Sequence, residues 1–422
     1  MDRLTSHIDA DRIWREIEAF AEIGKNGQGG VSRLAFSRED AEAREKIMRI
    51  LTDELKLPIR IDPLGNIFAR REGKRPDWPV IMTGSHLDSV RNGGMFDGVA
   101  GVICSLEAFR VMDQLELETE HPFELVVFAS EEPNKFGLST LGSRGIVGKI
   151  RKEELEFLRD DDGNEFRKAL AVIGGDLDRI EEAVRKTSEI EYFVEVHIEQ
   201  MPTLHQQKRD VAIVSEAGGI YRERISIGGV AGHSGTTPMA ARHDALCAAS
   251  TIILTLEKTA LEEADLAVAT VGRIKVSPNT VGIIPGIVEI DTEIRSIRQE
   301  IIQRIARAVE DMASKVAEER KVRISKRVIY ETHPISFSAD VREAIRAAAE
   351  SLGLKTLELF SMAGHDAVHI SAIAKSGMIF IPSRNGFSHC PEEWTIKEDL
   401  GKGAQCLLKT LLLLDKKDQR LS

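Results

Sequence analysis

Short apolar runs alternate with stretches of helical apolar spacing along most of the chain. Residues 8–22 and 38–55 have apolar side chains at helical intervals, and the second stretch follows Ser37, which suits a helix N-cap. The runs at 80–82 and 125–129 have the length and composition of buried strands. Strands that alternate with helices predict an α/β domain with a doubly wound, mixed sheet.

The pattern changes between residues 212 and 330. Two amphipathic helices, expected at 238–260 and 299–319, are separated and flanked by strands with alternating polarity. Their order, β-α-β-β-α-β, predicts a small ferredoxin-like domain. We expect this domain to interrupt a metal-binding catalytic domain formed by residues 1–211 and 331–422, and to serve as a lid and dimerisation domain.

Composition narrows the class of protein. A chain of 422 residues exceeds the usual size of a single core, which favours two domains. With 57 basic and 68 acidic residues the net charge is −11, which argues against nucleic acid or an anionic membrane as a partner. The charged N-terminus, the lack of apolar runs of transmembrane length and four cysteines without paired spacing lead us to expect a soluble, cytoplasmic protein.

Side chains that can bind metal ions follow the ends of several predicted strands. Each has an ordinary alternative: a surface His-x-Asp pair, a helix cap, an exposed acidic loop or a core histidine. Their joint occurrence instead predicts a two-metal hydrolase site, which needs a bridging carboxylate, terminal ligands and a base for the shared water. The residues are His86, Asp88, Asp97, Glu131, Glu132, His197 and His389.

Five segments together resemble the amidase, hydantoinase and carbamoylase family. The resemblance runs from near Gly29 to about Trp394, which is nearly the whole chain. It implies a di-zinc-peptidase-like catalytic domain that acts on linear amides. The segments are Gly84-Ser85-His86-Leu87-Asp88-Ser89-Val90, Asn92-Gly93-Gly94-Met95-Phe96-Asp97-Gly98, His197-Ile198-Glu199-Gln200, Gly232-His233-Ser234-Gly235 and Gly364-His365-Asp366-Ala367.

The resemblance also implies a role for each metal-site residue. Asp97 would bridge two divalent metal ions, Glu131 would be the general base and Asp88 would orient its neighbours. The mixed imidazole and carboxylate ligands suit zinc, manganese, cobalt or nickel. The terminal ligands would be His86, Glu132, His197 and His389.

The substrate-binding residues implied by the resemblance lie mostly outside these motifs. His233 would stabilise the oxyanion, and Asn279 and Arg295 would hold the substrate carboxylate, with all three contributed across the interface of a homodimer. Gln200, Gly364 and His365 would line the same pocket. One departure is Met201, which follows Gln200 where the family usually has glycine.

We therefore expect hydrolysis of N-carbamoyl-L-amino acids or similar ureido acids to amino acid, ammonia and carbon dioxide. An allantoate amidohydrolase is the nearest alternative, followed by a β-ureidopropionase or an aminoacylase or dipeptidase. A metal-free binding relative is an alternative from a different class, against which the intact ligand set and Glu131 argue.

Overall fold

The computed structural model describes residues 5–417, which form two compact units. The first unit contains the chain up to Ser215, Phe337–Leu359 and the chain from His365 onward. The second unit contains Glu216–Ser336 and, after a return of the chain, Phe360–Gly364. The return segment was not anticipated from the sequence, and it includes Gly364.

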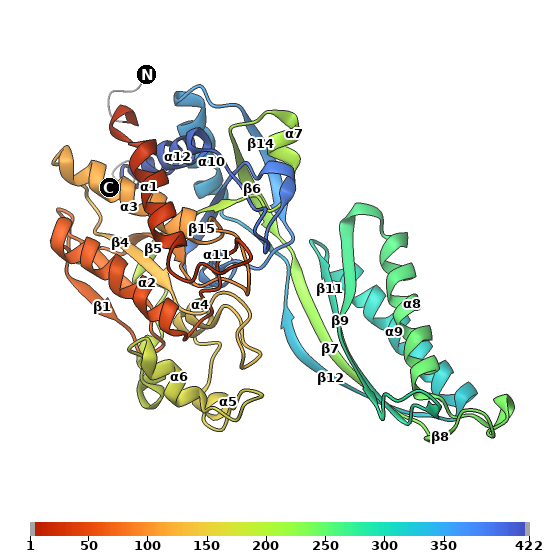
Figure 1. The fold of residues 1–422 in the computed structure, drawn as a ribbon. Coiled ribbons are helices and arrows are strands. Elements are labelled where there is room, and N and C mark those ends of the chain that lie inside the picture. The colour runs from red at the N-terminus through yellow and green to blue at the C-terminus, as the bar shows by residue number, and fades with distance from the viewer. Residues whose placement is uncertain (1–4, 418–422) are drawn as a thin grey trace. The chain divides into compact units, whose positions relative to one another are not determined.

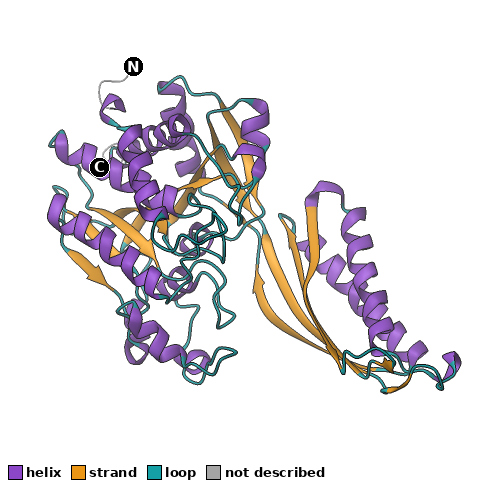
Figure 2. Cartoon of the chain, viewed as in Figure 1, coloured by secondary structure: helices purple, strands orange, loops and turns teal. Residues whose placement is uncertain are grey.

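A mixed nine-stranded sheet is the main element of the first unit (Figures 1 and 2). Its order is β1-β2-β4-β3-β5-β15-β6-β13, and β14 also pairs with β6. Strands β4, β3, β5 and β15 are mutually parallel, whereas β2 and β6 run antiparallel to their neighbours. The predicted mixed α/β fold is confirmed. The strands are β1 (Ile59–Ile61), β2 (Ile67–Arg71), β3 (Val80–His86), β4 (Phe123–Phe128), β5 (Ile190–Ile198), β6 (Val211–Ala217), β13 (Ile335–Ser336), β14 (Thr356–Ser361) and β15 (Lys375–Ile381).

The main core lies on one face of this sheet. Helix α3 (Val99–Gln114) is apolar on nearly every side and packs against β3, β4 and β5, with α1 and α12 beside it. Because side chains alternate along a strand, Val194, Val196 and Ile198 of β5 enter this core. The intervening Glu195 and His197 face the opposite side, which positions them for the site described below.

Several helix boundaries differ from those expected. The helix expected over 38–55 is α-helical to Arg49 and continues as a π-helical turn over Ile50–Glu54. Ser37 caps it as predicted. Among residues 5–417 no helix is long and apolar enough to cross a membrane. The remaining α-helices of the first unit are α1 (Ala10–Ala21), α2 (Arg38–Arg49), α4 (Leu141–Ile146), α5 (Lys152–Leu155), α6 (Phe166–Val172), α7 (Thr203–Gln207), α10 (Ala339–Ser351), α11 (Asp366–Ile370) and α12 (Lys397–Asp415).

The second unit has a four-stranded antiparallel sheet in the order β12-β7-β11-β9, with α8 and α9 against one face (Figure 2). Its main elements follow the chain order β-α-β-β-α-β. Helix α8 begins at Ala245, later than expected, because the side chain of Asp244 caps it. The elements are β7 (Gly219–Gly228), β8 (Gly232–His233), α8 (Ala245–Glu262), β9 (Ala267–Ser277), β10 (Ile283–Ile284), β11 (Ile287–Ser296), α9 (Gln299–Arg320) and β12 (Arg323–Thr332).

Candidate metal centre

Two buried histidines come from neighbouring parallel strands. Strand β3 pairs with β5 so that Thr83 lies opposite Val194, and continuing this register by three residues brings His86 opposite His197. Their ring centroids are 6.1 Å apart. In each ring Nδ1 contacts a backbone carbonyl oxygen, that of Asp88 at 3.0 Å or Ile198 at 2.9 Å, which leaves Nε2 directed at the site.

Asp97 lies between these two histidines and a third, His389. Its Oδ1 is 3.1 Å from His197 Nε2 and 3.5 Å from His86 Nε2, while its Oδ2 is 3.5 Å from His389 Nε2. Asp97 is not the N-cap of α3, because Gly98 occupies that position at φ 66°. The Asp97 carboxylate is therefore available for the site, and each oxygen faces a different set of partners.

The acidic pair after β4 is held in place by Asp88. The backbone N–H groups of Glu131 and Glu132 donate to the two Asp88 carboxylate oxygens at 3.3 and 3.0 Å. Glu132 Oε1 then lies 3.1 Å from His389 Nε2, and Glu131 Oε2 lies 3.7 Å from His86 Nε2. Asp88 thus positions the acidic loop with its carboxylate and His86 with its backbone carbonyl.

The three histidines carry shifted pKa values. Burial alone would lower the pKa of His86, but the Asp97, Glu131 and Asp88 carboxylates raise it well above its ordinary value. Burial is likewise outweighed at His197, whose pKa is raised by Asp97. Hydrogen bonds to Asp97 and Glu132 raise the pKa of His389 to about 11.

The acidic residues show the complementary effect. Burial would raise the pKa of Asp97, yet His197 and the other two histidines bring it well below its usual range. Burial raises the pKa of Glu131 well above its ordinary value, and the neighbouring carboxylates add to this against the opposite effect of His86. The pKa values of the two carboxyls therefore shift in opposite directions although both groups lie near His86.

The donors are suited to two metal ions. Three trios each offer atoms within 4.8 Å of one another: His86-Asp97-His197, Asp97-Glu132-His389 and Glu195-His197-His365. The first two share Asp97, whereas the third shares only His197 with the first. Among residues 5–417, no lysine or arginine forms an ion pair with Asp97, Glu131 or Glu132. Buried carboxylates without a basic partner need cations or protons, and divalent metal ions with nitrogen and oxygen ligands meet this need.

Two of the predicted substrate residues lie at this centre. Gln200 Nε2 donates to Asp97 Oδ2 at 2.7 Å, and Gln200 has a left-handed backbone with φ 59°. The Gln200 side chain thus lies at the site even though Met201 follows it where a glycine was expected. The His365 ring lies 4.7 Å from that of His197 and is buried.

The sequence interpretation missed three supporting residues. Glu393 Oε1 accepts from the backbone N–H groups of Phe96 and Asp97, at 2.9 and 3.0 Å. Ser388 Oγ donates to Asp97 Oδ2 and to Glu393 Oε2. Glu195, fully buried in β5, accepts from Ser85 Oγ at 2.7 Å. A charged residue inside the apolar run of β5 was the available signal for Glu195.

The other predicted substrate residues lie in the second unit and are not all together. His233 in β8 is opposite Ile283, and the N–H of Ser234 donates to the Gly282 carbonyl oxygen, so the loop with Asn279 is nearby. Arg295 is near the other end of β11, whose start pairs with Ser277. Eight residues of strand separate these ends, or about 26 Å.

Arg295 has partners of its own at that end. Its Nε donates to Glu293 at 2.7 Å and its Nη1 to the Met362 carbonyl oxygen at 2.9 Å. Met362 belongs to the same return segment as Gly364. The second unit thus presents two distinct groups, one containing His233 and Asn279 and the other containing Arg295 and Gly364.

Comparison with known proteins assigns the chain to a family and identifies amidohydrolases similar to it. A family model described as Peptidase family M20/M25/M40 matches residues 82–413. The N-carbamoyl-L-amino-acid amidohydrolase of Paenarthrobacter aurescens is 38% identical, covering 96% of this chain and 98% of that protein. The allantoate amidohydrolase of Bacillus subtilis is 31% identical, covering 94% and 96%. The crystal structure of AtUAH in complex with (S)-hydroxyglycine superposes with a TM-score of 0.90 at 30% identity, covering 98% and 100%.

Gly98 provides a test of the histidine geometry. A Cβ at this position would overlap the His86 imidazole, and the backbone has φ 66°. We expect Gly98→Ala to displace His86 and to lower the metal content of the purified protein, measured by inductively coupled plasma mass spectrometry.

The matched control is Gly163→Ala. Gly163 has a similar φ of 82°, but no described atom lies within 4 Å of the added Cβ. Both variants should lose about 1 kcal/mol of unfolding free energy from backbone strain, whereas only Gly98→Ala should lose metal. Equal metal content in the two variants would contradict the assignment of His86.

The raised histidine pKa values lead to a pH prediction. Because the pKa values of all three histidines are raised, protons compete with a metal ion for them, so apparent metal affinity should increase as the pH rises. Calorimetric titration in buffers of different ionisation enthalpy should detect the release of protons when metal binds. His389→Gln should release about one fewer. Metal binding without proton release would show that these histidines are not ligands.

Proposed function

Since the chain belongs to Peptidase family M20/M25/M40, we propose that it is a metal-dependent hydrolase of linear amide C–N bonds with N-carbamoyl-L-amino acids as substrates. The observation that carries this proposal is the sharing of Asp97 between two trios of possible ligands, with Glu131 beside them. The name of the Paenarthrobacter aurescens relative supports the substrate class.

We propose two divalent ions, held by His86 and His197 on one side and by Glu132 and His389 on the other. Asp97 would contact both, and the distances from its two oxygens support this role. Such ions, when bound, polarise a carbonyl oxygen and lower the pKa of a water molecule. Zinc, manganese, cobalt and nickel all suit the donors.

Glu131 is proposed as the general base and acid. Its carboxylate would take a proton from the attacking water and then give it to the leaving nitrogen. Burial raises its pKa, which strengthens it as a base, while its contact with His86 keeps it at the edge of the proposed ligands. Asp88 assists by fixing the backbone that carries Glu131.

The substrate carboxylate is assigned to Arg295, whose planar guanidinium can pair with both oxygens. Arg295 binds the carbonyl of Met362, three residues before His365, and the His365 ring meets that of His197 edge to face. Because Met362 is only three positions from His365 along the chain, we assign Arg295 to the metal centre of its own protomer. Gln200, Gly364 and His365 complete the proposed pocket.

His233 and Asn279 are assigned instead to the partner's active site in a homodimer. They lie about 26 Å along β11 from Arg295, which is too far for all three to bind one small substrate from one protomer. This revises the expectation that Arg295 also acts across the interface. His233 would donate to the developing oxyanion, an interaction worth about 2.7 to 4 kcal/mol in comparable sites.

The second unit has a surface suited to this homodimer. Strand β9 is at the edge of its sheet, with Val268 and Ile274 54% and 48% exposed. The neighbouring α8 exposes Leu254 and Leu261 on one face. Edge-to-edge pairing of two copies would cover these groups in a symmetric interface.

We also propose a cytoplasmic location, because four free cysteines accord with a reducing compartment.

Substrate specificity is the direct test. The metal-loaded protein should release ammonia from N-carbamoyl-L-amino acids faster than from allantoate, and should act weakly on N-acetyl-amino acids and dipeptides. Glu131→Gln should retain metal and fold but lose about 100-fold or more in kcat, whereas Glu132→Gln should lose metal. Faster release from allantoate would reassign the substrate, and an active Glu131→Gln would assign the base elsewhere.

Mixed dimers test the origin of the substrate-binding residues. Two affinity tags allow dimers with one Glu131→Gln chain and one His233→Ala chain to be isolated, and these should recover about half of wild-type activity, because one site is intact. Dimers that combine Glu131→Gln with Arg295→Ala should remain inactive.

The same experiment distinguishes the alternatives. Activity in the Glu131→Gln and Arg295→Ala pairing would return Arg295 to the partner's site. An inactive Glu131→Gln and His233→Ala pairing would mean that His233 serves its own protomer. His233→Ala combined with Arg295→Ala is a third test and should also recover about half of the activity, because one site would keep both residues.

A further inference from the structure

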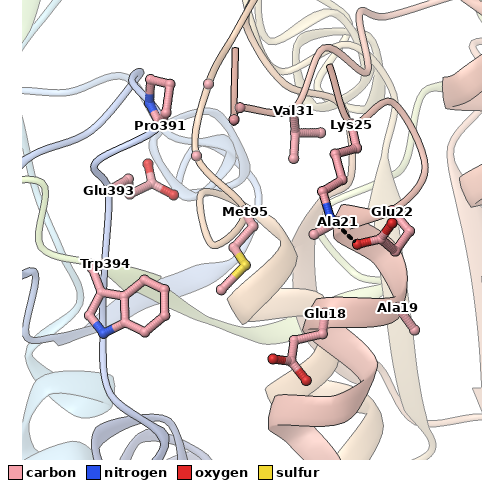
Figure 3. A pocket seen from close by; sticks show the side chains of 14 residues that line it. Glu18, Ala19, Ala21, Glu22, Lys25, Val31, Met95, Pro391, Glu393 and Trp394 are labelled. Atoms are coloured by element: carbon pink, nitrogen blue, oxygen red, sulfur yellow. Dashed lines mark hydrogen bonds and ion pairs between the residues drawn. The ribbon is translucent and has the colours of Figure 1, made fainter. Parts of the chain in front are cut away.

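A cavity separate from the metal-centre side chains lies in the first unit beside the C-terminal end of α1 (Figure 3). Its volume is about 550 Å³, within the range of small-molecule sites. Three parts of the chain line it: the end of α1 with the following residues to Val31, the loop Gly93–Met95, and Pro391 to Trp394. These segments are far apart in sequence.

The wall of this cavity combines apolar and acidic side chains. Figure 3 shows the Met95 side chain between Trp394 on one side and Glu18 on the other. The Trp394 indole is supported by Trp14 and Phe96, with ring centroids 5.3 and 5.7 Å away. A supported aromatic ring of this kind offers a firm surface for an apolar group or for a cation.

The acidic groups are in excess over basic ones. Glu18, Glu22 and Glu393 line the cavity together with one lysine, Lys25, which is paired with Glu22 at 2.5 Å. The Glu18 carboxylate is exposed, and no hydrogen bond or ion pair joins it to another side chain in the described part of the chain. The C-terminal end of α1, which has no basic residue in its last turn, adds further negative potential.

We propose that this cavity is a ligand site for a small organic cation, with an apolar body against Met95 and Trp394 and its charged group near Glu18. The volume, the supported indole and the excess of acidic over basic side chains in the lining together favour that chemistry. A cationic group near Glu18 gains a charge contact that an anion or a neutral polar molecule does not.

Glu393 connects the cavity to the metal centre. It lines the cavity, is 2% exposed, and accepts from the backbone N–H groups of Phe96 and Asp97. Gly94, in the cavity wall, has no room for a Cβ because the Glu393 side chain occupies that space. A ligand that presses on this loop therefore acts on the segment that carries Asp97, and this coupling rests on the proposed metal-binding role.

Calorimetric titration of the metal-loaded full chain tests the site, with phenethylammonium as the probe. We expect saturable binding, at least about tenfold weaker binding of the neutral phenethyl alcohol, and a similar loss in Glu18→Gln combined with Glu22→Gln. The matched control, Glu42→Gln on the exposed face of α2, should bind as the wild type does. No saturable binding, or equal binding by both variants, would overturn the proposal.

The coupling has a separate readout. Linkage requires the probe to change metal affinity by the same factor by which metal changes probe affinity, and we expect a factor of about five or more. Chelator competition with and without phenethylammonium measures it. Glu393→Gln should bind the probe and reduce that factor. Identical probe affinity with and without metal would exclude coupling, and it would leave the test of hydrolysis unaffected.

Discussion

Buried negative charge is the constraint on which the site depends. Asp97, Glu131 and Glu132 lie together at the end of the sheet, and the only ion-pair partners among residues 5–417 for these three are histidines. Carboxylates gathered in a low-dielectric environment repel one another and raise one another's pKa values. Cations are therefore required for the fully ionised arrangement, and the histidines must give up their protons to admit them.

The surrounding structure holds the carboxylates in place despite this repulsion. Two further carboxylates do this by accepting from backbone N–H groups: Asp88 holds the loop with Glu131 and Glu132, and Glu393 holds the segment with Asp97. Asp88 and Glu393 add negative charge to the region, but their hydrogen bonds fix the backbone that carries the other carboxylates. Because Glu393 also lines the cavity beside α1, a change in that cavity can affect the segment that carries Asp97.

Sequence reasoning went far where side-chain chemistry and strand pattern coincide. The mixed fold followed from strands that alternate with helices, and the family followed from a resemblance in five segments. The candidate metal ligands could be grouped because parallel strands bring their carboxyl ends to one edge. Glu393 was missed because its partner is the backbone of residues nearly 300 positions earlier, a contact with no local pattern. The grouping of Arg295 apart from His233 was also beyond reach, since it depends on how far β11 runs rather than on residue type.

The pairing of β3 with β5 has a consequence for how the protein assembles. His86 and His197 share a face of the sheet only because the two strands are aligned as they are, with Thr83 opposite Val194. A slip of one residue in either strand would turn its histidine toward the core. If these histidines bind metal as proposed, a misaligned sheet could not collect the ions, and metal uptake would report correct strand alignment during folding.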